Sequence, residues 1–271
     1  MPRFLLLLAC CCSLLVQAAG KEIHIGIEPF FTPRLLVSSF QPMRDAMEKQ
    51  LGRPVVLLTA PDYRQFVRRI EQHEFDLVII GPHTARYAEL HAGYLPALIG
   101  RTRLSGLVVV PRGGEALQIS DLNKQTIALP DALTVTAMLG EAWLKKQGLQ
   151  VHTRYYAFHN AAAIALLQGD ARAAIINKTA FANLPVDIRS ALRVVGETQS
   201  LPHMVVLADA KLAPAERKRY IDSLAGFVNS RENGDSFAAR LGFSGLDPVK
   251  PGELAIMEPF VTELQRRLDT E

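Results

Sequence analysis

Cysteine is nearly absent from this chain. All three cysteines lie within the first 19 of its 271 residues, at Cys10, Cys11 and Cys12. If that segment is removed, disulfides, thiolate metal sites and cysteine nucleophiles are excluded together. The remaining 252 residues (271 − 19) must then be stabilised by packing alone, and this length is enough for one large or two medium domains.

The first 19 residues have the three parts of a signal peptide. Arg3 supplies a positive charge, residues 4–16 form an apolar stretch, and residues 17–19 give a small-residue cleavage site. We therefore expect a signal peptide over residues 1–19 and an exported, periplasmic protein. Lipid anchoring at Cys10 is the less favoured alternative, because the apolar stretch before it is short for a lipoprotein signal. No later apolar run reaches the roughly 18 residues of a membrane-spanning helix.

Strong net charge and catalytic motifs are missing as well. Without Arg3, 29 Lys and Arg residues (30 − 1) oppose 27 Asp and Glu residues, a net charge of +2 (29 − 27). No basic run is interleaved with aromatic residues, so nucleic acid is not an expected partner. The chain has no P-loop and no H-E-x-x-H motif, and residues 242–245 (GFSG) lack the spacing of a nucleophile elbow. We expect no enzyme, no cofactor and no metal site.

Short apolar runs alternate with helical patterns along almost the whole chain. Several runs are continuously apolar, which is typical of strands in a parallel sheet covered on both faces. The predicted strands are residues 23–27, 55–58, 77–80, 106–110, 126–129, 153–156, 173–176, 192–195 and 204–208. The predicted helices are residues 36–50, 63–73, 84–91, 135–147, 161–168, 214–229, 235–241 and 252–268. This alternation predicts an α/β fold.

Two extended segments of similar pattern, residues 104–111 and 203–209, indicate how the chain is divided. A self-contained set of strands and helices lies between them, and the chain after the second is almost purely helical. We predict two α/β lobes joined by two crossing strands. Lobe 1 comprises residues 21–105 plus 206–271, and lobe 2 comprises residues 106–205. Lobes connected twice in this way suit hinge closure around a ligand.

Four predicted strands end directly before helices, at residues 61–63, 81–84, 130–136 and 158–160. Ligands of open α/β sheets bind beyond the carboxyl ends of strands, and helix N-termini favour anions. No lysine or arginine lies at these junctions, so an anion would depend on neutral donors and helix dipoles, with histidine able to add charge near its usual pKa of about 6.5. The expected ligand-binding residues are Tyr63, Thr84, Thr134, Thr136 and His159.

Some residues at these junctions have a structural alternative. Asp62 and Asn160 are better explained as helix N-caps than as ligand contacts, and Thr134 fits either role. Tyr63 could be an ordinary half-buried aromatic residue, and His83 is a weaker ligand candidate. The histidines elsewhere in the chain show no metal-ligand spacing.

These motifs occur in a familiar order. The chain resembles the phosphate/phosphite/phosphonate-type substrate-binding proteins of bacterial ABC importers, which have the type II periplasmic binding protein fold. The residues that carry the resemblance are Pro42-Met43, LGRPV at 51–55, Asp62-Tyr63, FDL at 75–77, Gly81-Pro82, ISDL at 119–122, His159 before ALLQG at 165–169, and LRVV at 192–195. The resemblance implies that Tyr63, Thr84, Thr134 with Thr136, and His159 line the ligand cleft.

The chain departs from the family pattern in the ligand cleft. The turn that resembles the family's Ser/Thr-rich phosphate turn is LTVTA at 133–137 and lacks glycine. That loss limits how closely backbone N–H groups can surround an oxyanion. Ala85 replaces a frequent aromatic residue, and Arg172 stands where an acidic residue is usual. The missing acid argues against an aminoalkyl phosphonate as the ligand.

The leading hypothesis is a monomeric solute-binding protein that closes over a small anion of phosphonate, phosphite or phosphate type and delivers it to an ABC permease. A periplasmic sensory or accessory protein that signals to a membrane partner is the main alternative, because the ligand turn departs from the family pattern. An enzyme on the same fold is a third possibility, with no residue-level support.

Overall fold

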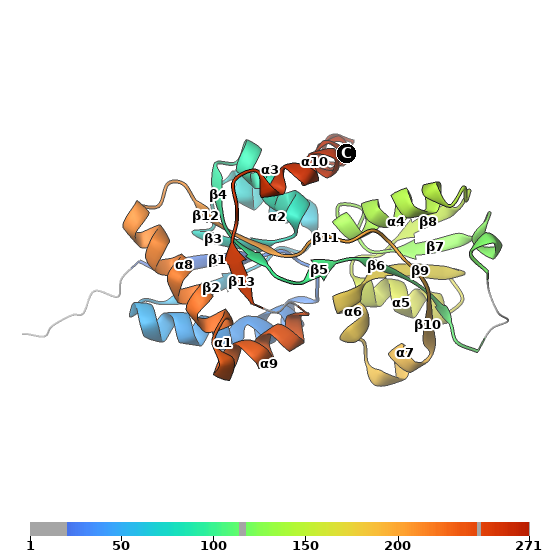
Figure 1. Cartoon of the computed structure of the whole chain (residues 1–271), viewed down its shortest axis with the longest axis horizontal. Coiled ribbons are helices and arrows are strands. Elements are labelled where there is room, and N and C mark those ends of the chain that lie inside the picture. The colour runs from blue at the N-terminus through green and yellow to red at the C-terminus, as the bar shows by residue number, and fades with distance from the viewer. Residues whose placement is uncertain (1–20, 114–117, 243–244, 271) are drawn as a thin grey trace, which may run out of the picture.

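The computed structural model describes residues 21–113, 118–242 and 245–270. The expected signal peptide, Cys10 and part of residues 242–245 lie outside them. The described chain forms two α/β lobes, which lie side by side in Figure 1. Two extended segments run between them, so the predicted fold class, two α/β lobes joined by crossing strands, is confirmed.

The first lobe is built on a six-stranded sheet in the order β13-β4-β12-β3-β1-β2. Its strands are β1 (Ile23–Ile27), β2 (Val55–Leu58), β3 (Leu77–Ile80), β4 (Tyr94–Gly100), β12 (Val205–Asp209) and β13 (Leu246–Pro248). Its helices are α1 (Pro33–Leu51), α2 (Tyr63–Glu71), α3 (Pro82–His91), α8 (Pro214–Val228), α9 (Arg231–Leu241), the 3-10 helix η2 (Glu253–Met257) and α10 (Glu258–Asp269). β1 pairs with β2 and β3 in parallel, and β12 runs antiparallel between β3 and β4.

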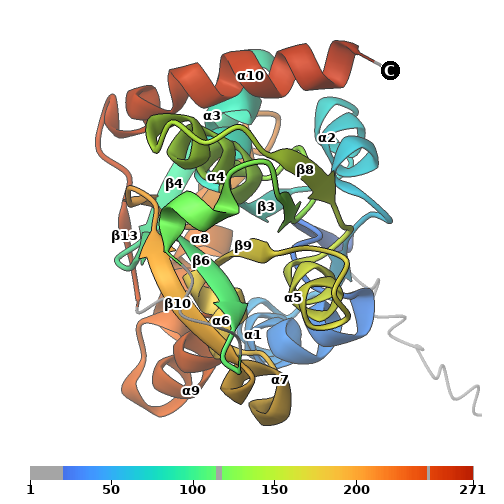
Figure 2. The same ribbon diagram turned by 90° about the vertical axis from the view of Figure 1, so that its right-hand side faces the viewer.

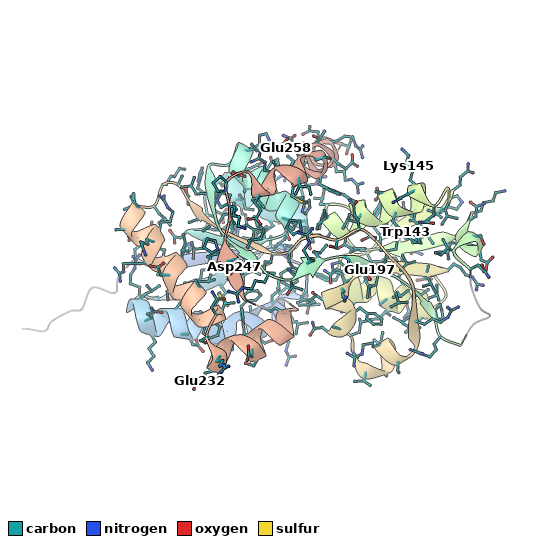
Figure 3. All side chains as sticks on the ribbon, viewed as in Figure 1. Trp143, Lys145, Glu197, Glu232, Asp247 and Glu258 are labelled. Atoms are coloured by element: carbon teal, nitrogen blue, oxygen red, sulfur yellow. The ribbon has the colours of Figure 1, made fainter. Side chains whose placement is uncertain are left out.

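The second lobe has a five-stranded sheet in the order β10-β6-β9-β7-β8. Its strands are β6 (Gly106–Pro111), β7 (Thr126–Leu129), β8 (His152–Tyr155), β9 (Ala173–Asn177) and β10 (Leu192–Glu197). Its helices are η1 (Ile119–Leu122), α4 (Val135–Lys146), α5 (His159–Leu167), α6 (Lys178–Ala182) and α7 (Val186–Ser190). On α4, Trp143 packs against this sheet whereas Lys145 is exposed (Figure 3).

The two lobes are connected by β5 (Arg103–Leu104) and β11 (Leu201–Pro202), which pair antiparallel with Leu104 opposite Leu201. β5 leads into β6, and β11 leads into β12 (Figure 1). Each sheet therefore contains one strand that continues a crossing segment and runs antiparallel to its neighbours. The apolar runs predicted parallel sheets. Because of these strands, both sheets instead contain parallel and antiparallel pairs.

Each sheet is covered on both faces, which explains the continuous apolar runs. In the first lobe, Ile25 and Leu77 pack in one cluster with α1 and α8, while Val78 and Ile80 pack in another with Phe66 of α2. All four residues of β3 are buried. A strand whose two faces both meet helices has no position for a polar side chain.

Four strands lie outside the predicted strand ranges: β4, β13 and the short crossing strands β5 and β11. β4 contains Pro96, and proline normally argues against an interior strand because it has no N–H to donate. Here Leu98 pairs with Val206 and Pro96 pairs with Leu207, so Ala97 is an extra residue that forms a bulge. The bulge accommodates the proline. β13 interrupts the tail that was expected to be helical.

The lobes also meet at α10, which packs on α3 and extends over the junction (Figures 1 and 2). The Arg267 side chain donates to Glu141 Oε2 of α4 (2.6 Å) and to the carbonyl oxygen of Ala132 (2.6 Å). Arg64 of α2 donates to the Arg267 carbonyl oxygen (2.9 Å). Beside these contacts, an apolar cluster combines residues of both lobes and α10, namely Tyr63, Val67, Tyr87, Leu133, Met138, Val261 and Leu264.

We expect Arg267→Met to lower the free energy of unfolding by about 1–3 kcal/mol, because it removes charge-assisted hydrogen bonds between the lobes from a largely buried side chain. Urea titration would measure the change. Arg266→Met is the matched control, since the Arg266 side chain is more than half exposed and, among the described residues, forms its ion pair with Glu263 of the same helix. Equal destabilisation by the two substitutions would contradict a stabilising role for the contact between lobes.

Candidate functional site

A small cavity of about 50 Å³ lies between the lobes. Its polar lining residues are Glu28, Tyr63, Thr134, Thr136, His159, Asn177, Thr179 and His203. Its apolar lining residues include Phe30, Phe31, Leu104, Val135, Met204 and Leu241. The volume has room for about four water molecules, which is the scale of one small oxyanion.

Four of the five expected ligand residues line this cavity: Tyr63 from lobe 1, and Thr134, Thr136 and His159 from lobe 2. The fifth, Thr84, is buried behind the wall, and its hydroxyl donates to Glu28 Oε1 (2.7 Å). The structure thus brings residues from distant parts of the chain to one place. Contact of each with a ligand remains a prediction.

Tyr63 is positioned by the start of α2. Asp62 caps this helix, because its Oδ1 accepts from the Gln65 N–H (2.7 Å), as the sequence predicted. Tyr63 is the next residue, and its hydroxyl makes no hydrogen bond to any residue in the described part of the chain. Burial, with smaller contributions from Glu28 and Asp131, raises the pKa of Tyr63 well above its usual value. The hydroxyl is therefore a neutral donor.

The first turn of α4 forms part of the opposite wall. Thr134 is its N-cap, with Oγ1 accepting from the Ala137 N–H (3.1 Å) and donating to the Asp131 carbonyl oxygen (2.7 Å). Its hydroxyl is thus committed within the helix, and the predicted capping role is confirmed. The Thr136 hydroxyl bonds to nothing within the described ranges. Because the first N–H groups of a helix lack intrahelical acceptors, this turn offers donors to an anion.

His159 begins α5, one position after the N-cap Phe158. Asn160 was predicted to be the cap of this helix, but the helix starts earlier, so that prediction is wrong. Asn177 caps α6 through its Oδ1, and its Nδ2 lies 3.1 Å from His159 Nε2. His203, from the segment between β11 and β12, completes this side of the cavity, with its Nε2 3.4 Å from Thr179 Oγ1.

The histidines of the cavity are neutral. Burial lowers the pKa of His159 to about 3 and that of His203 to about 4. The sequence suggested that histidine could add positive charge, but removal of the rings from water disfavours the protonated form. His83 is also neutral, with a pKa lowered to about 4 mainly by burial. Its Nε2 lies 2.7 Å from the Leu133 carbonyl oxygen, so it contacts the other lobe outside the cavity.

Glu28 was missed by the sequence analysis. It directly follows β1, but no helix was predicted directly after that strand, so the search for strands that end before helices did not include it. Its Oε2 accepts from the Gly81 N–H (2.8 Å), and its Oε1 accepts from Thr84. A Cβ at position 81 would lie 2.9 Å from Oε2, which explains the glycine. Asn177, at the end of β9, was missed for the same reason.

The Glu28 carboxyl titrates near neutral pH. Burial raises its pKa to about 7, against the opposing effect of the hydrogen bonds from Thr84 and Gly81, and Asp131 raises it further. No lysine or arginine is among the residues that line the cavity in the described chain. The site therefore combines neutral donors with one acidic group.

We expect the stability of Glu28→Gln relative to the wild type to be greater at pH 8 than at pH 5. Below about pH 4.5 the carboxyl is protonated in both states. Between pH 4.5 and 7 the unfolded chain ionises while the folded protein keeps the proton, so the wild type loses stability as pH rises through this window. The full difference is on the order of 3 kcal/mol. Thermal unfolding at both pH values would measure it.

Glu232→Gln, on the exposed surface of α9 (Figure 3), is the control and should change stability equally at the two pH values. A Glu28→Gln effect that is independent of pH would contradict the burial-induced shift.

A family model described as "ABC transporter, phosphonate, periplasmic substrate-binding protein" matches residues 25–254. The chain belongs to this family. The resemblance drawn from the sequence motifs is thereby confirmed. It is a family of periplasmic transport proteins that bind a small molecule and act with an ABC permease, not a family of enzymes. Helix α10 lies beyond the matched residues.

Solved structures share the fold at low sequence identity. PhnD1 from Prochlorococcus marinus in complex with methylphosphonate has a TM-score of 0.80 and 15% identity, covering 91% of this chain and 99% of that chain. A binding protein component of an ABC phosphonate transporter from Pseudomonas aeruginosa has a TM-score of 0.77 and 16% identity, over 92% and 89%. The aliphatic sulphonate binding protein SsuA from Escherichia coli has a TM-score of 0.61 and 14% identity, over 91% and 87%. No curated protein sequence matches this chain.

Two further observations bear on the site and its surroundings. Within residues 21–113, 118–242 and 245–270, no helix combines the length and the apolar character needed to cross a membrane. The same residues contain no group of three or more histidine, cysteine or acidic side chains arranged to hold a metal ion.

Proposed function

We propose that this protein binds a small oxyanion of the phosphonate, phosphite or phosphate type in the cavity between its lobes and delivers it to an ABC permease. The observation that carries the proposal is the first turn of α4, which faces the cavity together with the uncommitted hydroxyls of Tyr63 and Thr136. Hydroxyl and backbone N–H donors on buried residues that face one cavity are a suitable lining for a single anion.

The cavity size and the composition of its wall support a compact ligand. The cavity volume is about 50 Å³, and Phe30, Phe31 and Leu104 are among the apolar residues of its wall. An oxyanion with one short alkyl group would place its oxygens at α4 and its carbon at these side chains. We infer that residues 21–105 plus 206–271 and residues 106–205 are the two bodies that separate to admit it and close around it.

Isothermal titration calorimetry with methylphosphonate, phosphite, phosphate and methanesulfonate tests the proposal directly. We expect saturable binding of at least one phosphorus oxyanion to the mature protein at pH 6.5, with one site per chain. Absence of binding across all four compounds would overturn the oxyanion assignment.

We expect Thr136→Val to weaken the best ligand of that panel by about 10- to 100-fold, because a hydrogen bond from a hydroxyl to a charged group contributes about 1.5–3 kcal/mol. The substitution preserves shape and removes only the hydroxyl. Thr153→Val on the exposed strand β8 of the same lobe is the matched control and should bind as the wild type does. If both variants bind as the wild type does, Thr136 is not a ligand contact.

A further inference from the structure

The Glu28 carboxyl is an unusual group in the lining of an anion-binding cavity. It is buried and lines the cavity from the end of β1. Each of its oxygens accepts one hydrogen bond, from the Gly81 N–H or the Thr84 hydroxyl. A carboxylate offers about four acceptor positions, so two remain beyond these bonds. An oxyanion that occupies the cavity therefore meets another group of acceptors.

Among the described residues that line the cavity, none is a lysine or arginine that could offset this carboxyl. The carboxyl accepts from the neutral donors Gly81, the N-cap of α3, and Thr84 within that helix, and α2 contributes the neutral hydroxyl of Tyr63 to the cavity wall. From lobe 2, the charged group that acts on it is Asp131, which is acidic. The cavity-lining imidazoles of His159 and His203 are held neutral by burial.

Two oxygens that both accept cannot approach within hydrogen-bond distance without repulsion. A proton between them converts the same contact into a short O–H···O⁻ hydrogen bond, of about 2.5–2.7 Å. Both possible sources of that proton titrate near neutral pH. The pKa of Glu28 is about 7, raised by burial, and the second proton of a phosphoryl group also dissociates near this range.

We propose that Glu28 makes this site specific for a ligand that shares one proton with its carboxyl group, in a hydrogen bond between a Glu28 oxygen and a ligand oxygen. The ligand is then a hydrogen phosphonate or a related singly protonated oxyanion, and its binding at alkaline pH takes up one proton from solution. The inference rests on the proposed function. It assigns to Glu28 a role in specificity: a phosphonate can bring the bridging proton itself, whereas a sulfonate carries none and must find Glu28 already protonated.

The test is calorimetry with methylphosphonate between pH 6 and 9, in two buffers of different ionisation enthalpy at each pH. For the wild type we expect the affinity to fall by about tenfold per pH unit at pH values where both the Glu28 carboxyl and free methylphosphonate have lost the proton that the complex needs. Up to one proton should be taken up per ligand bound at pH 8.5. The preference for methylphosphonate over methanesulfonate should be greater at pH 8 than at pH 6.

Glu28→Gln supplies a permanent amide donor in place of the proton. This variant should bind the methylphosphonate dianion, so its affinity should not fall as the pH rises above the range in which the free ligand has lost its second proton, and binding there should take up no proton. Glu232→Gln, the same change on the exposed surface, should keep the wild-type profile. The phosphorus NMR shift of the bound ligand gives a second measurement and should remain that of a protonated species at pH 8 in the wild type.

Each outcome decides the matter. Binding with a flat pH profile in the wild type, or an identical profile in Glu28→Gln, overturns the bridging proton and leaves the proposed function standing. Tighter binding of 2-aminoethylphosphonate than of methylphosphonate at pH 8 also overturns it, since Glu28 would then pair with an ammonium group. If neither protein binds any oxyanion at any pH, the proposed function fails and the bridging proton fails with it.

Discussion

The antiparallel pairing of β5 with β11 is the constraint on which the rest of the structure depends. Because these two strands carry the chain between the lobes, the strands that continue them, β12 and β6, run antiparallel to their neighbours. The parallel strands of both sheets then end toward the junction, and the helices that follow them begin there. The cavity is therefore lined by residues that stand just after strands or at the first turns of helices, such as Glu28, Tyr63 and Thr136.

Burial then sets the chemistry of the cavity. It removes the charge from His159 and His203, keeps Tyr63 protonated, and brings the pKa of Glu28 to about 7. A single physical effect, the loss of water around each group, thus produces a wall of neutral donors with one group that exchanges a proton near neutral pH. Binding energy in such a site comes from directed hydrogen bonds and helix termini, and not from a fixed positive charge.

Much of this arrangement could be predicted from local sequence. The buried runs of β1 and β3 indicated the sheets, and the caps at Asp62 and Thr134 indicated where two helices begin. Local sequence could not show that Pro96 lies beside a bulge, because the bulge exists only in the pairing of β4 with β12. Nor could it show which histidines lose their charge, since that depends on how the two lobes enclose them. Glu28 could have been found by considering the end of every predicted strand, because it directly follows β1.

The contact of α10 with the second lobe has a geometric consequence. The lobes are joined at the paired crossing strands, at Arg267 with Glu141 and Ala132, and at His83 with the Leu133 carbonyl oxygen. The crossing strands are a covalent connection, whereas the contacts of Arg267 and His83 are hydrogen bonds that can break and form again. A rotation of one lobe away from the other about the crossing strands would therefore have to separate Arg267 from Glu141 and His83 from Leu133.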